Sequence, residues 1–248
     1  SACAIRSLGR SAMLASPVSS AAMRVLASGA NRHSNSGKSG VLVQWLLFAR
    51  SNRRNCPQRN QIIMTPTQRL RWYAQGFESA DLQTIIERML HNEAFSIAPA
   101  SCKHHHVYTG GLAEHTLEVV DYCNNNIAGL GLDYDVVIAA AIAHDWAKIH
   151  DYRQVPDPEN PENLIWVNAP YKFNIHHIAG SHAEFYRQAH NVLRLDTMRA
   201  IEHCILAHHG RKEWGSPVEP ATPEALLLHQ ADMWSAKFGP GKDKSVYG

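Results

Sequence analysis

Hydrophobic positions over the C-terminal two-thirds of the chain recur at intervals of three and four residues. This spacing runs from Asp81 to Asn92 and again from Leu112 to Ile127, and it is typical of amphipathic helices. The stretch from Asp135 to Ile149 is apolar almost throughout. A helix that is hydrophobic on all sides belongs in a core, so we expect this stretch to form a buried central helix.

Three further helices are predicted towards the C-terminus. One runs from about Ile178 to Leu193, one from Asp196 (as N-cap) to His208, and one from the cap Thr222 to about Phe238. The loop from Tyr152 to Pro170 contains four prolines, so we expect it to be irregular. Because no strand pattern appears, residues 64–248 are predicted to form an all-α helical bundle.

Residues 1–63 have a different composition. They are rich in Ser, Ala and Arg and contain no Asp or Glu. Of the 24 basic residues, 11 precede Glu78, which leaves 13 against 22 acidic residues from there on, a net charge of −9. We interpret this segment as a basic extension to the domain: disordered or mis-assigned upstream sequence, a basic arm, or an organellar transit peptide.

The expected location follows from these alternatives. It is cytoplasmic, or organellar if residues 1–63 are a transit segment. The apolar segment Val41–Ala49 is too short to span a bilayer, so no membrane association is expected. The five cysteines lack CxxC spacing, which favours reduced thiols over a zinc ribbon. The sequence gives no oligomeric state.

Histidine is the unusual residue of this chain. There are 16 histidines, and 14 of them lie between His104 and His229. Neutral imidazole is the commonest metal ligand in proteins, so this enrichment points to metal chemistry. Several of these histidines, together with two aspartates, occur in order on successive predicted helices: His115, His144-Asp145, His182, His208-His209 and Asp232.

Wide spacing between these residues means that a metal site would have to be built by packing helices together. The carboxylate of Asp145 has two oxygens and could bridge two ions, with His182 and His208 or His209 completing the second site. Imidazole and carboxylate without thiolate favour one or two divalent ions of Mn, Fe, Co, Ni or Zn. Two such ions can clamp a phosphoryl group while water attacks phosphorus, with Asp145 orienting the water. Lys148, three residues after Asp145, would stabilise developing charge.

These motifs resemble the HD-domain superfamily of metal-dependent phosphohydrolases. Three blocks are more specifically similar to the YhaM-type 3′→5′ exoribonucleases, and the similarity runs from about Asp81 to Lys237. The blocks are HHHVYTGGLAEHTLEVV (His104–Val120), ILAHHGRKEWGSPVEP (Ile205–Pro220) and EALLLHQADMWSAK (Glu224–Lys237). The first block alone also resembles relaxase-associated HD domains of mobile elements.

The resemblance implies an all-helical HD fold in which His115, His144, Asp145 and Asp232 bind one metal. It further implies that His182 and the His208-His209 pair serve a second ion, and that Lys148 corresponds to the lysine that follows the HD pair. His105 and His106 match paired histidines that would contact substrate phosphate or support the ligands. Three further residues, next to the double histidine, could hold a phosphate and stack a base: Arg211, Lys212 and Trp214.

The predicted function is therefore a metal-dependent phosphohydrolase or phosphodiesterase acting on nucleic acid or nucleotides, and the resemblance implies an action like that of a 3′→5′ exonuclease. The stretch before Asp81 shows no pattern of the OB-fold that YhaM-type nucleases carry, so short oligonucleotides or nucleotides are also expected substrates. Two alternatives use the same ligands. One is an HD-fold di-iron oxygenase, and the other is an accessory HD domain of a nucleic-acid-processing system.

Overall fold

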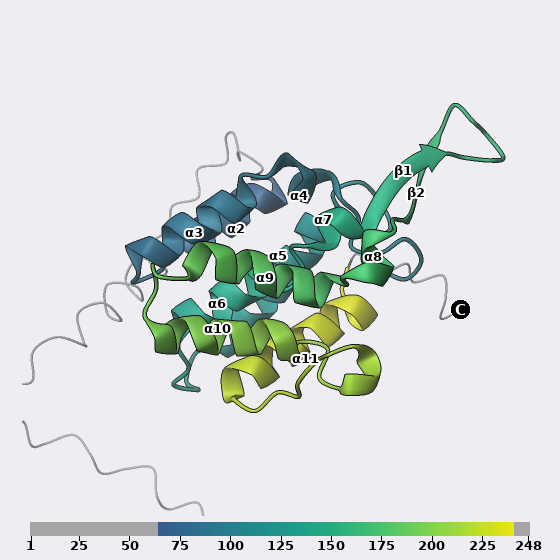
Figure 1. Cartoon of the computed structure of the whole chain (residues 1–248). Coiled ribbons are helices and arrows are strands. Elements are labelled where there is room, and N and C mark those ends of the chain that lie inside the picture. The colour runs from purple at the N-terminus through teal and green to yellow at the C-terminus, as the bar shows by residue number, and fades with distance from the viewer. Residues whose placement is uncertain (1–63, 241–248) are drawn as a thin grey trace, which may run out of the picture. The chain divides into compact units, whose positions relative to one another are not determined.

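The protein is described here from a computed structural model, which places residues 64–240 (Figure 1). The expectations for residues 1–63 lie outside this described part. Helices dominate it, which confirms the predicted fold class. They are α2 (Pro66–Ala74), α3 (Ala80–Leu90), α4 (Glu93–Ile97), α5 (Gly111–Asn126), α6 (Tyr134–Ala143), α7 (Lys148–Asp151), α8 (Tyr171–Asn174), α9 (His177–Ala189), α10 (Leu195–Ala207), the 3₁₀ turn η1 (Lys212–Trp214) and α11 (Pro223–Phe238).

Helix α6 is the centre of the core. Its N-cap Asp133 accepts a hydrogen bond from the backbone N–H of Val136, and every residue of the helix after Tyr134 is buried. Asp135 accepts backbone N–H bonds from Glu78 and Ser79 at 3.1 and 3.0 Å, which ties the start of α3 to α6. Helices α5, α9, α10 and α11 pack around α6, and Figure 1 shows α9 and α10 side by side in front of it.

The central helix is shorter than predicted. The pattern predicted a helix to Ile149, but α6 ends at Ala143, and a turn over residues 144–147 precedes α7. In a continued helix the N–H of Ala147 would bond the carbonyl of Ala143, whereas here it donates to Ser181 Oγ of α9 at 3.0 Å. A tertiary contact therefore ends the helix at the His-Asp pair.

The prediction of an irregular loop between Tyr152 and Pro170 is wrong for ten of its residues. Strand β1 (Tyr152–Pro156) pairs with β2 (Leu164–Asn168) as an antiparallel hairpin, in which Gln154 faces Trp166. Proline lacks the N–H that strand pairing needs, and two of the four prolines stand in the hairpin loop. Figure 1 shows the hairpin extending away from α7 and α8 at its base.

The ends of the last three long helices decide the positions of the site residues. Helix α9 begins at His177, and α10 begins at Leu195 after Arg194, so Asp196 is a first-turn residue and not the predicted cap. The prediction for α11 is confirmed, because Thr222 Oγ1 accepts the N–H of Ala225 at 3.3 Å. Among residues 64–240, no helix is both long enough and apolar enough to cross a membrane.

Candidate metal centre

The turn that carries His144 and Asp145 lies at the meeting point of four other helices. Helix α5 supplies His115, α9 supplies His177 and α11 supplies Asp232, and the C-terminal end of α10 leads into His208 and His209. A close approach at Gly180 allows α9 to reach the turn, because a Cβ there would lie 2.8 Å from the Cβ of Ala147. The side chains that converge on Asp145 form two groups.

The first ligand group is His115, His144, Asp145 and Asp232, all buried, with one ligand atom from each lying within 4.8 Å of the others. Asp145 Oδ2 is 3.3 Å from Nε2 of His115 and 3.3 Å from Nε2 of His144. Nε2 of His115 is also 3.3 Å from Asp232 Oδ1. These separations suit donors that share one small cation.

The second ligand group is His177, His208 and His209, whose ligand atoms also lie within 4.8 Å of one another. Nε2 of His177 is 3.3 Å from Asp145 Oδ1, and Nε2 of His208 is 3.5 Å from the same oxygen. One carboxylate therefore faces both groups, with Oδ2 towards the first and Oδ1 towards the second.

Hydrogen bonds at Nδ1 fix the orientation of most of these imidazoles. A backbone carbonyl only accepts, so a histidine whose Nδ1 contacts one must carry its proton there, which leaves a lone pair on Nε2. Three ligand histidines have such a carbonyl partner: His144 with Ala141 (2.8 Å), His208 with Ile205 (2.7 Å) and His209 with Trp214 (2.6 Å). Nδ1 of His177 contacts a carboxylate oxygen of Asp151 at 3.2 Å, with the same consequence.

Unsatisfied polar atoms show that these residues fit a cation. Asp145 Oδ1 and the Nε2 atoms of His177 and His208 are buried and have no hydrogen-bond partner among the described residues, while Asp145 Oδ2 is ion-paired with Lys148. Leaving a buried polar atom without a hydrogen-bond partner costs about 1–3 kcal/mol. Divalent transition metals accept this mixture of imidazole and carboxylate donors, so they would satisfy the orphaned atoms.

Electrostatics keep the donors in the protonation states that ligation requires. Burial would raise the pKa of Asp145, but the ammonium of Lys148 and the surrounding histidines hold it well below its usual value. Burial lowers the pKa of His144 and of His177, so both are neutral at neutral pH. For His115, burial acts to lower the pKa, but hydrogen bonds to Asp145 and Asp232 and their charges outweigh it, so the pKa is raised.

Comparison with known families agrees with this geometry. The model of the family described as "HD domain" matches residues 112–237, which contain every residue of both ligand groups. The chain belongs to the HD domain family. A second family model, described as "Putative helicase", matches residues 54–148 and overlaps the start of the HD domain.

Several curated relatives of this HD domain are exoribonucleases. The 3′-5′ exoribonuclease YhaM of Bacillus subtilis is 30% identical over 186 residues, which cover 73% of this chain and 55% of that protein. YhaM of Bacillus velezensis is 29% identical over 185 residues with the same coverage, and YhaM of Bacillus pumilus is 28% identical over 171 residues, 67% of this chain and 52% of that protein. The chain thus spans about half the length of the curated relatives it matches. No solved structure shows significant similarity to it.

The structure brings together six of the seven predicted ligands of the HD domain and leaves out His182. Nε2 of His182 pairs with Glu202 Oε1 at 3.0 Å, and the side chain is 30% exposed. His177, five residues earlier, faces Asp145 instead. Five residues turn an α-helix by about 500°, so His182 lies about 140° away from His177 around α9.

His177 is the ligand candidate that the sequence analysis missed. It stands in the first turn of α9, and it is buried although it follows directly on a polar loop. Its neighbour His176 has a φ of +69°, an uncommon conformation for a residue other than glycine, and their rings lie 4.2 Å apart. The sequence signal that could have identified His177 is the pair of adjacent histidines, His176 and His177, at the start of a helix.

Lys148 forms an ion pair with the carboxylate of Asp145, the aspartate of the HD pair. Its Nζ is 2.5 Å from Asp145 Oδ2, and the side chain is 9% exposed. The ammonium thus reaches the first ligand group from the first residue of α7.

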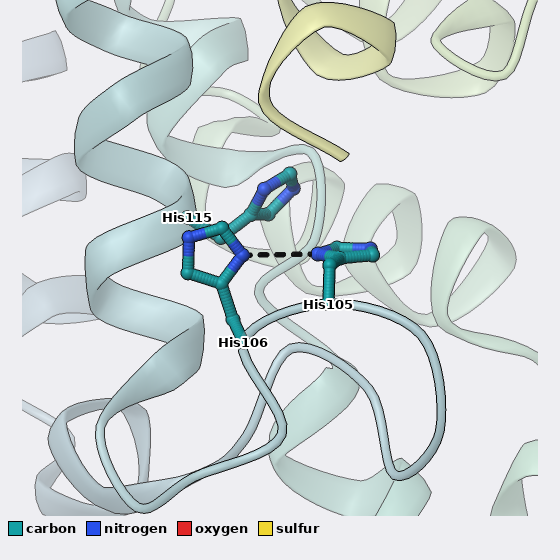
Figure 2. Close-up of side chains that lie close together, drawn as sticks. All are labelled: His105, His106 and His115. Carbon is teal, nitrogen blue, oxygen red and sulfur yellow. Dashed lines mark hydrogen bonds between the residues drawn. The ribbon is translucent and has the colours of Figure 1, made fainter. Parts of the chain in front are cut away.

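His105 and His106 adjoin the first ligand group from the loop before α5. Figure 2 shows the two rings beside His115, with Nδ1 of His105 and Nδ1 of His106 joined by a 3.1 Å hydrogen bond. The ring centroid of His115 is 4.9 Å from that of His105 and 5.5 Å from that of His106. Ligand atoms of all three lie within 4.8 Å of one another, so they are a third candidate cluster.

Arg211, Lys212 and Trp214 form an exposed turn beside the second ligand group. The guanidinium carbon of Arg211 lies 5.1 Å from the ring centroid of Trp214, and Trp214 is 47% exposed. The carbonyl of Trp214 accepts the Nδ1 proton of His209 at 2.6 Å. The turn is therefore attached directly to a candidate ligand.

Proposed function

We propose that this chain is a metal-dependent phosphodiesterase that hydrolyses nucleic acid, with RNA as the first substrate to test and nucleotides as the alternative. One observation carries the proposal: the buried carboxylate of Asp145 lies between two groups of histidines, and each of its oxygens faces one of them. A purely structural ion pair would need one partner, whereas this arrangement offers donors on both sides.

The two ligand groups define which residues would hold the ions. His115, His144 and Asp232 would bind one ion, His177, His208 and His209 the other, and Asp145 would contact both. Bound divalent ions supply Lewis acidity, which activates water and neutralises phosphate charge. The donor set suits Mn, Fe, Co, Ni or Zn without distinguishing among them.

Lys148 and Asp145 have complementary tasks in the proposed reaction. The Asp145 carboxylate orients the attacking water because it lies at the centre of both groups. Lys148, held within hydrogen-bonding distance of that carboxylate, adds positive charge where the phosphoryl group becomes more negative. Its burial keeps bulk water from screening this charge.

The exposed turn next to the second ligand group supports a nucleic-acid substrate. An indole that is about half exposed, with a guanidinium over its face, provides a stacking surface and a positive charge for a nucleotide. The names of the curated relatives specify 3′-5′ exoribonuclease activity, which makes an RNA 3′ end the first substrate to test.

Cys102, Cys123 and Cys204 are free thiols, which supports a cytoplasmic location.

A hydrolysis panel with Mn²⁺ tests the proposal. The substrates are RNA and single-stranded DNA oligomers labelled at the 5′ end, deoxynucleotides, cyclic nucleotides and a generic phosphodiester. We expect the wild-type chain to shorten RNA stepwise from its 3′ end. His144→Ala and Asp145→Ala should lose about 10³-fold or more of this activity while helical circular dichroism is retained.

The matched control is His91→Ala, which removes an exposed histidine outside the site and should leave activity unchanged. Hydrolysis that persists in Asp145→Ala would contradict the mechanism. Cleavage of nucleotides but not of oligomers would reject the exonuclease assignment. Oxygen uptake by the iron-loaded protein, without hydrolysis, would replace the proposal by a di-iron oxygenase.

A further inference from the structure

His115 differs from the other ligand histidines in what its Nδ1 contacts. The others have a backbone carbonyl or a carboxylate there, and each of these groups only accepts. Nδ1 of His115 instead lies 2.8 Å from the hydroxyl of Ser235 on α11. A hydroxyl can donate or accept, so by itself it does not decide which nitrogen of His115 carries the proton.

Glu118 removes this ambiguity. The Ser235 hydroxyl donates to Glu118 Oε2 at 2.6 Å, and an ionised carboxylate only accepts. With its hydrogen committed to Glu118, Ser235 must accept from His115, which places the proton on Nδ1. Nε2 of His115, which faces Asp145 and Asp232, is then the nitrogen whose lone pair would bind a metal ion.

The other oxygen of the same carboxylate faces His106. Glu118 Oε1 lies 3.2 Å from Nε2 of His106, a buried nitrogen that has no hydrogen-bond partner among the described residues. Because an ionised carboxylate carries no proton, its approach favours a proton on Nε2 of His106. A proton on Nε2 leaves the lone pair of His106 on Nδ1. The 3.1 Å contact between the two Nδ1 atoms then requires His105 to be the donor, so the free lone pair of His105 is on Nε2.

We propose that Glu118 is a positioning residue that sets the tautomers of His115 and His106, and through His106 that of His105. The proposal rests on the metal centre of the proposed function but on no particular substrate. It assigns to one carboxylate the role that backbone carbonyls have for His144, His208 and His209.

Helix geometry explains why these residues meet. Glu118 is three residues after His115 on α5, and Ser235 is three residues after Asp232 on α11, so each lies one turn from a ligand on the same face. Helices α5 and α11 pack together, which brings the two supporting residues into contact. The chain between them spans 117 residues, so this contact is purely tertiary.

The backbone at His106 gives independent support for a positioned side chain. Its φ is +49°, a conformation that few residues other than glycine adopt. A Cβ at Gly111 would overlap the carbonyl oxygen of His106, so the loop packs directly on the start of α5. This uncommon backbone conformation presents the buried imidazole to Glu118.

A third cation among His105, His106 and His115 is the competing explanation of this cluster. It would require the Nδ1 contact to be a pair of metal donors instead of a hydrogen bond. It would also require a donor from His115, whose Nε2 faces the first ligand group and whose Nδ1 contacts Ser235. The hydrogen-bonded chain gives a partner to both nitrogens of His106 and to the Nδ1 atoms of His105 and His115, so we favour it.

The isosteric variant Glu118→Gln tests the proposal. Its amide places one donor and one acceptor where the carboxylate had two acceptors, so it cannot accept from both Ser235 and His106. We expect ¹⁵N spectra of the histidine side chains, recorded on the full chain with and without Zn²⁺, to show either His106 in the Nδ1–H tautomer or a changed Nδ1 signal of His115. Zinc affinity should fall about 10- to 100-fold, as is typical when a carboxylate behind a ligand is removed.

Glu114→Gln is the matched control, because Glu114 is one turn earlier on α5 and bonds the hydroxyl of Tyr108 instead. It should change neither the spectra nor the zinc affinity. A folded Glu118→Gln protein in which both histidines keep the wild-type signals would overturn the proposal. Zinc bound to Nδ1 of His106 in the wild-type protein would overturn it in favour of the third cation.

Ser235→Ala provides a second route that does not depend on the amide. If Glu118 acts on His115 through Ser235, each single variant should weaken zinc binding, and the double variant should be no weaker than the worse of the two. Additive losses would contradict the chain. None of these measurements involves hydrolysis, so they test the proposal even if no substrate in the activity panel is hydrolysed.

Discussion

The two ligand groups differ in charge and in their place on the helices. The first combines His115 and His144 with two carboxylates, Asp145 and Asp232, and all four residues are buried. The second has three histidines and only the shared carboxylate of Asp145, and one of its histidines is partly exposed. More negative charge in a drier site means stronger attraction for a divalent ion, so we expect the first group to bind more tightly.

The second group is built from helix ends. His177 is in the first turn of α9, and His208 and His209 directly follow α10, next to the exposed turn that carries Trp214. His115 and Asp232, in contrast, lie inside long helices. Side chains at helix ends adjoin loops, so their positions can change more easily than those of side chains inside helices. We therefore expect the second group, and not the first, to change its geometry when substrate binds.

The largest effect should come from removing the charge that distinguishes the first group. Asp232→Asn keeps the shape and takes away one carboxylate, so the tighter of two Mn²⁺ binding steps should weaken by at least about 10²-fold. Titration calorimetry measures both steps. Asp196→Asn, an exposed first-turn aspartate of α10, is the control and should bind as the wild type does. An unchanged tight step in Asp232→Asn would show that charge does not separate the two groups.

A smaller and selective effect is expected at the second group. His177→Ala removes one of its three histidines, so the weaker binding step should lose about 10- to 100-fold in affinity while the tighter step is kept. His182→Ala is the matched control on the same helix, because His182 pairs with Glu202 and not with Asp145. Loss of binding in His182→Ala, with His177→Ala normal, would restore the original prediction from the sequence.

Acidification should destabilise the chelated protein through its neutral histidines. Burial lowers the pKa of His209 from 6.5 to about 4, and it also lowers that of His177. Below pH 6.5 these histidines take up protons in the unfolded chain but stay neutral in the folded one. The free energy of unfolding should therefore decrease as the pH falls from 6.5 towards 4. His115, with its raised pKa, has the opposite sign and partly offsets this trend.

Thermal unfolding in EDTA at half-unit pH steps measures this dependence. The aspartates of the site have pKa values held below the usual 3.8, so they contribute only at still lower pH. His209→Asn should have a shallower slope between pH 6.5 and 4. An equal slope in that variant would show that the second group is already protonated in the folded protein.

The smallest effect is expected outside both groups. Trp214→Ala removes the proposed stacking surface, which is worth about 1 kcal/mol or more per base and corresponds to about a fivefold increase in KM for an RNA oligomer. The catalytic rate constant should change little, because no ligand is altered. A lower rate with unchanged KM would instead assign Trp214 to the support of His209, whose Nδ1 proton its carbonyl accepts.

Most of the fold could be predicted from the sequence, and the structure brings together six of the seven residues that were predicted as ligands. Helical periodicity located α3, α5, α10 and α11 to within a few residues, because side-chain spacing along a helix is a local property. The hairpin was missed because its prolines interrupt the alternation of hydrophobic and polar residues that identifies a strand. The end of α6 was missed because it is set by a hydrogen bond from the Ala147 N–H to Ser181 on another helix. Neither of these features follows from local preference.

The sequence by itself determined the chemistry of this protein: which side chains can ligate a metal, and that they stand on helices that must pack together to meet. Only the tertiary structure decided which of them lie close enough together to share an ion. The start of α9 sets the phase that turns His177, and not His182, towards Asp145. Packing of α5 on α11 brings Glu118 to Ser235 across 117 residues. Helix phase and helix contact depend on the whole core, so no local pattern encodes them.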